Sequence, residues 1–258
     1  MEVELLSYTP EPERAIAVAA RLCYSPLDAT KLKANFTEEQ ACEFVEKLAD
    51  LGHMSAFEHA TFTFGVAGIS RACTHQLVRH RLASYNQQSQ RYVKFGEGLD
   101  VVIPPEISKN KDAVATFLSA RYECYQAYKK LLDCGIKAED ARYILPNAAS
   151  SNIVITMNAR ELLHFFSLRC CNRAQWEIRS LAWHMLKLCK EVAPTVFKNA
   201  GPGCVRGTCP EGEMCCKHPY STISLDMPED FVYVENGHIT GAKIWGLEMK
   251  VDKNVHED

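Results

Sequence analysis

Short alternating or β-branched runs of residues predict four strands in this chain. They span residues 3–8, 60–66, 99–103 and 151–156. Longer stretches repeat their apolar residues every three or four positions, as amphipathic helices do. The expected helices span residues 10–22, 37–51, 70–78, 113–134, 137–144, 158–169 and 174–192. Because strands and helices alternate irregularly, with several helices in succession, the pattern predicts an α+β fold with a single sheet and helices packed on it.

Polar residues at the expected helix ends support these boundaries. Thr37 with Gln40 three residues later forms a capping box. Ser70 and Asn158 each carry a side chain that can cap the helix that follows. Gly52 stands where the second helix should stop, because glycine accepts the left-handed backbone that ends many helices. The residues before Thr37 and after Gly52 are expected to be loops.

The composition changes near Gly201, where a Gly- and Pro-rich stretch holds a third of the twelve cysteines, Cys204, Cys209, Cys215 and Cys216. Two interpretations compete here: a zinc site with thiolate ligands, and free thiols in an ordered loop. The spacing lacks the C-x-x-C pairs of ordinary zinc sites, so we assign no metal.

The end of the chain reads as an appendage. Residues 231–240 favour a hairpin, because Asn236-Gly237 suits the positive φ values of a tight type I′ turn. We therefore divide the chain into a domain over residues 1–217 and an extension over 218–258, whose end should fray.

Charge and composition exclude some classes of function. The chain has 258 residues and a formal net charge of -3, which argues against a protein that mainly binds nucleic acid. It contains no apolar run that could span a bilayer and no signal peptide, so we expect a cytoplasmic protein without a membrane partner. With no export signal, the scattered cysteines are expected to be mostly free thiols in the core.

The most polar stretch of the chain is residues 79–91, RHRLASYNQQSQR. Arg79, His80 and Arg81 cannot all point into one core, so the segment should face anions such as phosphate. The amide and hydroxyl side chains that follow suit a loop that hydrogen-bonds a polar ligand. A solvated face, a nucleic-acid patch and simple capping of the preceding helix C-terminus stay open as alternatives.

The spacing of this stretch resembles the signature of the flavin-dependent thymidylate synthases: Arg-His-Arg, seven residues, a serine and, two positions later, an arginine. Further blocks follow the family's order at residues 53–59, 142–146, 158–169 and 174–179. The resemblance thus covers most of the chain up to about residue 200.

The resemblance implies the reductive methylation of dUMP to dTMP. Methylenetetrahydrofolate would give the methylene and leave as tetrahydrofolate, and FAD, recharged by NADPH, would give the hydride. It also implies a homotetramer with sites built between chains. It places the family's catalytic arginine at Arg169, where a cation against the carbonyl and imide edge of uracil would stabilise developing negative charge.

The resemblance also implies two sets of binding residues. Those for dUMP are Gln76, Arg79, Gln87, Gln88, Ser89, Gln90, Arg91, Arg142 and Arg169. Those for FAD are His53, Ser55, Glu58, Arg79, His80, Arg81, Gln87, Asn158, Arg160 and His164. Ser89 has no base beside it in the sequence, so we interpret it as a ligand of phosphate or backbone rather than a nucleophile.

Three residues depart from the family pattern. Gln87 stands where some members have Glu, Ser55 where some have Thr, and His164 where others have Asn. Each replacement still offers a donor or an acceptor, so we expect tuning rather than loss of binding. His53 and His59 lie beside aromatic or apolar residues and could be core histidines; for His59 that is the preferred interpretation.

A different class of function also fits part of the sequence. A non-catalytic module could use the arginines for nucleic-acid phosphates and Cys204 to Cys216 for zinc. That module would be colourless, whereas a flavoprotein would be yellow.

Overall fold

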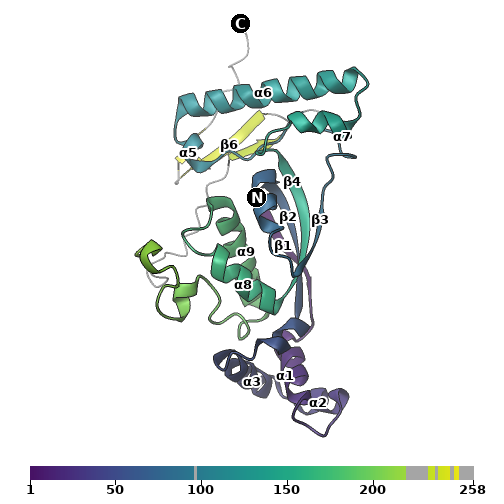
Figure 1. Ribbon diagram of the computed structural model, residues 1–258, viewed down its shortest axis with the longest axis vertical. Coiled ribbons are helices and arrows are strands. Elements are labelled where there is room, and N and C mark those ends of the chain that lie inside the picture. Colours follow the sequence, from purple (N-terminus) through teal and green to yellow (C-terminus); the bar gives the residue numbers. More distant parts are fainter. Residues whose placement is uncertain (96–97, 219–231, 236–237, 245–246, 250–258) are drawn as a thin grey trace.

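The computed structural model describes residues 1–95, 98–218, 232–235, 238–244 and 247–249. A four-stranded antiparallel sheet forms its centre (Figure 1). Its strands lie in the order β1 (Glu2–Tyr8), β2 (Thr61–Ser70), β4 (Ser150–Asn158) and β3 (Ala83–Gln87). The predicted α+β fold, with helices packed on a sheet, is confirmed; beside the single sheet that was predicted, the structure contains a second, three-stranded sheet near the C-terminus.

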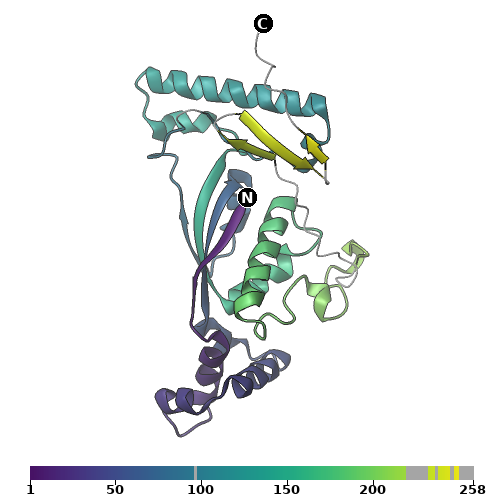
Figure 2. The same cartoon turned by 180° about the vertical axis from the view of Figure 1, so that it is seen from behind.

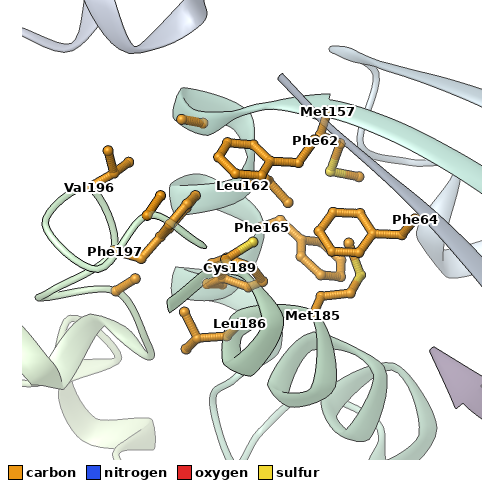
Figure 3. Packing of buried hydrophobic residues seen from close by; sticks show 14 of the residues in the cluster. Phe62, Phe64, Met157, Leu162, Phe165, Met185, Leu186, Cys189, Val196 and Phe197 are labelled. Carbon is orange, nitrogen blue, oxygen red and sulfur yellow. The ribbon is translucent and has the colours of Figure 1, made fainter. Parts of the chain in front are cut away.

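One face of the sheet builds the main core. Phe62 and Phe64 of β2 and Ile155 of β4 are fully buried, and helices α8 (Ala159–Arg169) and α9 (Trp176–Val192) cover them (Figure 3). Burying an aromatic side chain of this size contributes about 1.5–3 kcal/mol. The core therefore holds α8 firmly against the sheet. The outer side of α8 is not part of this core.

Helices also lie at the two ends of the sheet, on opposite sides of the molecule (Figures 1 and 2). One end carries α1 (Pro12–Leu22), α2 (Ala29–Asn35) and α3 (Glu38–Asp50). The other carries α5 (Pro105–Ser108), α6 (Lys111–Asp133) and α7 (Ala138–Ala141). A second core under α6 contains Leu99, Val101 and Tyr128.

The second face of the sheet is exposed within the part of the chain that the structure describes. Leu6 is 51% exposed and Val154 38% exposed. Between them lie small and hydroxyl-bearing residues, and the Thr63 and Thr156 hydroxyls hydrogen-bond each other across β2 and β4 over 3.0 Å. Glu2, Glu4 and Asn152 also lie on this open face, which is hollowed around Gly65 and Val154.

The predicted caps are confirmed. Thr37 and Gln40 form a capping box at the start of α3. The Ser70 side chain caps α4 (Arg71–Leu77), and the Asn158 side chain caps α8. Gly52 has a φ of +73°, which a side chain would make costly, and it follows the end of α3.

Two expectations about strands are wrong. Residues 83–87 form β3 and not a loop; this edge strand pairs only with β4, so its polar side chains can face water without breaking the sheet. Residues 99–103 form no named strand. Val101 makes a single bridge to Ala149, and the apolar side chains of this segment pack under α6 instead.

The helices also differ in places from the expectation. Residues 29–35, expected as loop, form α2, capped by the Asp28 side chain. The helix expected over residues 137–144 divides into α7 and a 3₁₀ turn, η2 (Arg142–Ile144). Within the described residues, no helix is both long and apolar enough to cross a membrane.

The C-terminal part contains the expected hairpin, β5 (Val232–Glu235) paired with β6 (His238–Ile244), and a third strand, β7 (Leu247–Met249). The expected turn at Asn236-Gly237 lies outside the described residues.

The cysteines are free, as expected, but the expectation that most lie in the core is wrong. Only Cys73, Cys170 and Cys189 are buried. The Gly- and Pro-rich loop forms the short turns η3 (Gly203–Arg206) and η4 (Gly212–Met214). Across the described residues, no group of three or more His, Cys, Asp or Glu side chains is arranged to hold a metal ion.

Candidate active site

The centre of the candidate site is a contact between Arg169, the last residue of α8, and His80, which follows α4. Arg169 Nε–H donates to His80 Nε2 over 3.1 Å. On the other side of the ring, Nδ1 lies 3.2 Å from Oε1 of Glu161. His80 and Glu161 are only 5% and 6% exposed. We call Glu161, His80 and Arg169 the Arg169 triad.

Hydrogen-bonding chemistry fixes the tautomer of His80. A guanidinium can only donate, so Nε2 must be the ring nitrogen without a proton, and Nδ1–H must donate to the Glu161 carboxylate. Burial lowers the pKa of His80 below its usual value; the hydrogen bond to Glu161 opposes this effect, and the charge of Arg169 adds to it. His80 is therefore neutral at pH 7.

Among the described residues, Nε is the one nitrogen of the Arg169 side chain that has a hydrogen-bond partner. His80 accepts from Nε, and no partner of Nη1 or Nη2 is found among the residues that the structure describes. Arg169 is partly buried. Its terminal N–H groups therefore form a planar, positively charged edge that a ligand can accept from.

Two aromatic side chains hold His80 in place. The ring of Phe165 packs edge to face against the imidazole, with ring centroids 4.9 Å apart. The hydroxyl of Tyr85 lies 2.9 Å from the carbonyl oxygen of Leu77 and 2.8 Å from that of His80. Burial raises the pKa of Tyr85, which keeps this donor protonated. The turn between α4 and β3 is thus held on both sides.

A buried carboxylate fixes the start of α4. Glu177 of α9 accepts from the backbone N–H of Ser70 over 2.7 Å and from the Ser70 hydroxyl over 2.5 Å. The same hydroxyl accepts from the backbone N–H of Cys73, which caps the helix. Burial raises the pKa of Glu177.

The residues expected to bind FAD gather on two neighbouring elements, α8 and the 3₁₀ turn η1 (Met54–His59). His53, Ser55 and Glu58 lie exposed at η1. Arg160 and His164 lie exposed one helical turn apart on α8, as expected. An ion pair between Glu58 and Arg160 joins the two elements.

The other expected flavin residues lie nearby. The His164 ring centroid is 5.9 Å from that of His80. Arg79 and Arg81 flank His80 and are exposed, and neither forms an ion pair with another described residue. Asn158 accepts a hydrogen bond over 2.9 Å from the backbone N–H three residues later, so its side chain oxygen is already engaged in capping α8.

Three of the expected nucleotide-binding residues line a pocket. Gln88, Ser89 and Gln90 face a cavity of about 320 Å³ together with Lys94 and Asp100. Cavities of this size hold small ligands. Nε2 of Gln90 is buried without a partner among the described residues, and such orphaned donors are rare unless a ligand or water completes them.

Two further residues that were expected to bind the nucleotide both contact Glu139 of α7. Arg91 binds its carboxylate through Nε and Nη2, at 3.1 and 2.8 Å. Arg142 binds its backbone carbonyl over 3.1 Å. Residues 51 positions apart are thus held beside each other, although the pocket lining does not include them.

Gln87 and Gln76 are engaged within the chain. Nε2 of Gln87 donates to Thr74 Oγ1 over 3.2 Å and to Ser151 Oγ over 3.1 Å, so Gln87 ties β3 to α4 and β4. Gln76 is partly buried on α4, where its Nε2 lies 3.5 Å from the Ala72 carbonyl.

Sequence reasoning missed several residues of the site. Glu161, Tyr85, Glu139 and the capping role of Glu177 were not identified. One signal in the sequence could have identified Glu161. It precedes Phe165 by one helical turn on the apolar face of the predicted helix, where a buried carboxylate needs a hydrogen-bond partner. The interpretation of His59 as a core residue is wrong, because His59 is exposed.

Known proteins with similar sequences cover most of this chain. The family model described as "Thymidylate synthase complementing protein" matches residues 4–195. A flavin-dependent thymidylate synthase from Geobacter sulfurreducens is 56% identical over 217 residues, which are 84% of this chain and 94% of that protein. The flavin-dependent thymidylate synthase of Clostridium tetani is 48% identical, over 84% of this chain and 93% of its own length.

A solved structure has a similar fold. The UMP/dUMP methylase PolB from Streptomyces cacaoi, bound with 5-Br dUMP, superposes with a TM-score of 0.68 and 26% identity. The match covers 76% of this chain and 93% of the methylase chain. Because the family model matches residues 4–195 and the relatives from Geobacter sulfurreducens and Clostridium tetani are 56% and 48% identical over 84% of the chain, the chain belongs to the family of flavin-dependent thymidylate synthases.

Proposed function

We propose that the chain catalyses the reductive methylation of dUMP to dTMP, the reaction of the flavin-dependent thymidylate synthases. The observation that carries this proposal is the Arg169 triad. It holds the Arg169 guanidinium through Nε, and its two terminal nitrogens have no partner among the described residues. The solved methylase with a dUMP analogue adds support, because its fold matches three quarters of the chain.

Arg169 acts on the uracil ring. The ring is a poor nucleophile, and its reaction at carbon builds negative charge on the carbonyl and imide edge. The terminal N–H groups of Arg169 face that edge and stabilise the charge as it develops. Because His80 is neutral, it orients the guanidinium without adding a second positive charge beside it.

The nucleotide lies at Gln88, Ser89 and Gln90, with its phosphate toward basic residues. Gln90 lines the pocket, and its buried Nε2 has no partner among the described residues. Arg91 and Arg142 complete the phosphate side, and both contact Glu139. Gln76, Arg79 and Gln87 are the remaining nucleotide residues in this proposal.

FAD fits the exposed residues around η1 and α8. Arg79 and Arg81 offer guanidinium groups without a carboxylate partner among the described residues, which suits the diphosphate of FAD. Bound FAD supplies the hydride that converts the transferred methylene into a methyl group. His53, Ser55, Glu58, His80, Asn158, Arg160, His164 and Gln87 hold or support it. Methylenetetrahydrofolate and NADPH are the usual co-substrates of the family.

The chain works as a homotetramer in this proposal. The open face of the sheet supports it: Leu6 and Val154 are exposed there, and a second copy could cover them. A single chain also leaves Arg169 outside the residues that line the nucleotide pocket. A cytoplasmic location is likewise part of the proposal.

Residues 1–217 carry the activity, and residues 218–258 form an extension. The family match ends at residue 195, and all expected site residues precede residue 170.

The experiment combines a spectrum with a turnover assay. Freshly purified protein, reconstituted with FAD if pale, should be yellow and release flavin on denaturation. With dUMP, methylenetetrahydrofolate and NADPH it should form dTMP. A colourless protein that neither takes up FAD nor forms dTMP, and that instead binds RNA or DNA with strong salt dependence, would overturn the proposal in favour of a nucleic-acid module.

A further inference from the structure

Glu161 is a buried carboxylate that the reaction does not obviously need. It lies in the first turn of α8, in line with Phe165 and Arg169 on the inner side of the helix. Its side chain contacts only His80 by a hydrogen bond within the described residues. Burying an ionised carboxylate costs several kcal/mol unless strong partners offset it. An apolar residue at position 161 would pack into the core at lower cost. The contact between Glu161 and His80 therefore has a role other than packing.

That role concerns the ring nitrogens of His80. With Glu161 present, Nδ1–H has an acceptor and Nε2 keeps a lone pair for Arg169. Without a carboxylate, the ring can hold its proton on Nε2 instead. Two donors, Nε2–H and the Arg169 Nε–H, would then face each other across 3.1 Å, and the guanidinium would turn away.

We propose that Glu161 is a positioning residue for the reaction: it selects the His80 tautomer that accepts from Arg169 and thereby aims the terminal nitrogens of Arg169 at the substrate. The inference rests on the proposed role of Arg169. Glu161 touches no substrate itself, and it acts through His80. Other devices that fix the ring, such as the Phe165 contact, orient it without distinguishing between its two nitrogens.

The first test reads the tautomer directly, without cofactor or substrate. In ¹⁵N-histidine-labelled protein, NMR distinguishes Nδ1–H from Nε2–H, and the His80→Gln spectrum identifies the His80 signals among nine histidines. The wild-type protein should show His80 with Nδ1–H. Glu161→Leu should move the population toward Nε2–H, and Glu161→Gln should retain Nδ1–H, because the amide oxygen can still accept.

The second test reads catalysis. Glu161→Leu should lower kcat about 10- to 100-fold, as lost positioning partners of catalytic groups do, with the KM for dUMP and the flavin content nearly unchanged. The kcat of Glu161→Gln should lie between those of the wild type and Glu161→Leu. If Glu161→Leu does not fold, Glu161→Gln is the variant that tests the proposal. Glu177→Gln is the matched control for loss of a buried carboxylate: it should reduce stability but leave the His80 tautomer unchanged.

Each outcome decides the inference. An Nδ1–H signal that persists in Glu161→Leu would overturn the tautomer part. A changed tautomer with unchanged kcat, in a protein where Arg169→Ala abolishes turnover, would overturn the catalytic part. A wild-type protein that forms no dTMP would overturn the proposed function and the catalytic part with it, while the NMR result would still decide the tautomer.

Discussion

Glu177 accepts two hydrogen bonds from Ser70, one from its backbone and one from its hydroxyl. Because the hydroxyl donates to Glu177, its lone pairs are free to cap α4 at the same time. The carboxylate therefore connects core helix α9 to the segment that carries His80, and it satisfies a backbone group that is buried far from water.

Removing this carboxylate should cost stability. Glu177→Leu leaves the Ser70 N–H buried without a partner, so the free energy of unfolding should fall by about 1–3 kcal/mol in urea titrations. Glu46→Gln is the control, because the exposed Glu46–Lys198 ion pair should contribute less than about 1 kcal/mol. Equal losses for both variants would contradict the role of Glu177.

Arg169 and Arg91 should respond differently to truncation. Arg169→Ala removes a donor to developing charge, so kcat should fall about 100- to 1000-fold while the protein stays yellow. Arg91→Ala should mainly raise the KM for dUMP, because it removes a contact made equally before and during reaction. Steady-state and single-turnover kinetics, with flavin occupancy measured, separate the two.

Lysine at position 169 provides the matched control. Arg169→Lys keeps the charge but loses both the Nε–H donated to His80 and the planar fork of terminal donors, so it should restore little activity. Near-normal turnover of Arg169→Ala at saturating dUMP would show that Arg169 only binds substrate.

Acid should switch the site off through His80. Protonation places a proton on Nε2 and disrupts the bond from Arg169, so kcat should fall at low pH. Burial lowers the pKa of His80, so this fall should begin below its usual value of 6.5. The charged or titratable groups that act on the ring are Glu161, His164 and Arg169 on α8, and the Tyr85 hydroxyl on β3 donates to the backbone carbonyl of His80.

The stability of the folded chain should also decrease as the pH falls. Between the lowered pKa and 6.5 the unfolded chain binds more protons at His80 than the folded chain, so the unfolding free energy decreases as the pH falls through that window. Thermal unfolding of wild type and His80→Gln across pH 5 to 7 measures it. A wild-type kcat that falls already above pH 6.5, or an identical pH dependence of Tm in His80→Gln, would contradict this assignment.

The extension should be dispensable for chemistry. A chain truncated after Lys217 lacks none of the expected site residues, so FAD binding and turnover should be largely retained. Absorbance of the purified truncation and its kcat test this. Loss of flavin from a truncation that remains folded by circular dichroism would show that the extension completes the site.

Local signals in the sequence predicted much of the fold. The Thr37–Gln40 box and the caps at Ser70 and Asn158 involve residues three positions apart, so the sequence itself shows both partners. Edge strand β3 escaped prediction because its side chains need not be apolar: Ser84 and Asn86 face out, and the tyrosine between them supplies the inward contact.

The centre of the site depends on contacts that no local pattern encodes. Glu161 and His80 are 81 positions apart, and Arg91 meets Glu139 across 48. The resemblance to the family predicted that Arg169 is catalytic and that His80 binds FAD. It did not indicate that the two side chains are in contact. Only the packing of α8 beside the turn after α4 brings them together.

Helix α8 sets the spacing of the residues in the candidate site. Glu161, Phe165 and Arg169 follow one another at four-residue steps on its inner side, while Arg160 and His164 occupy the outer side. One residue inserted between positions 161 and 169 would rotate everything beyond it by about 100°. In this helix a change of side chain alters one contact, but a change of length separates Arg169 both from His80 and from the residues expected to bind FAD.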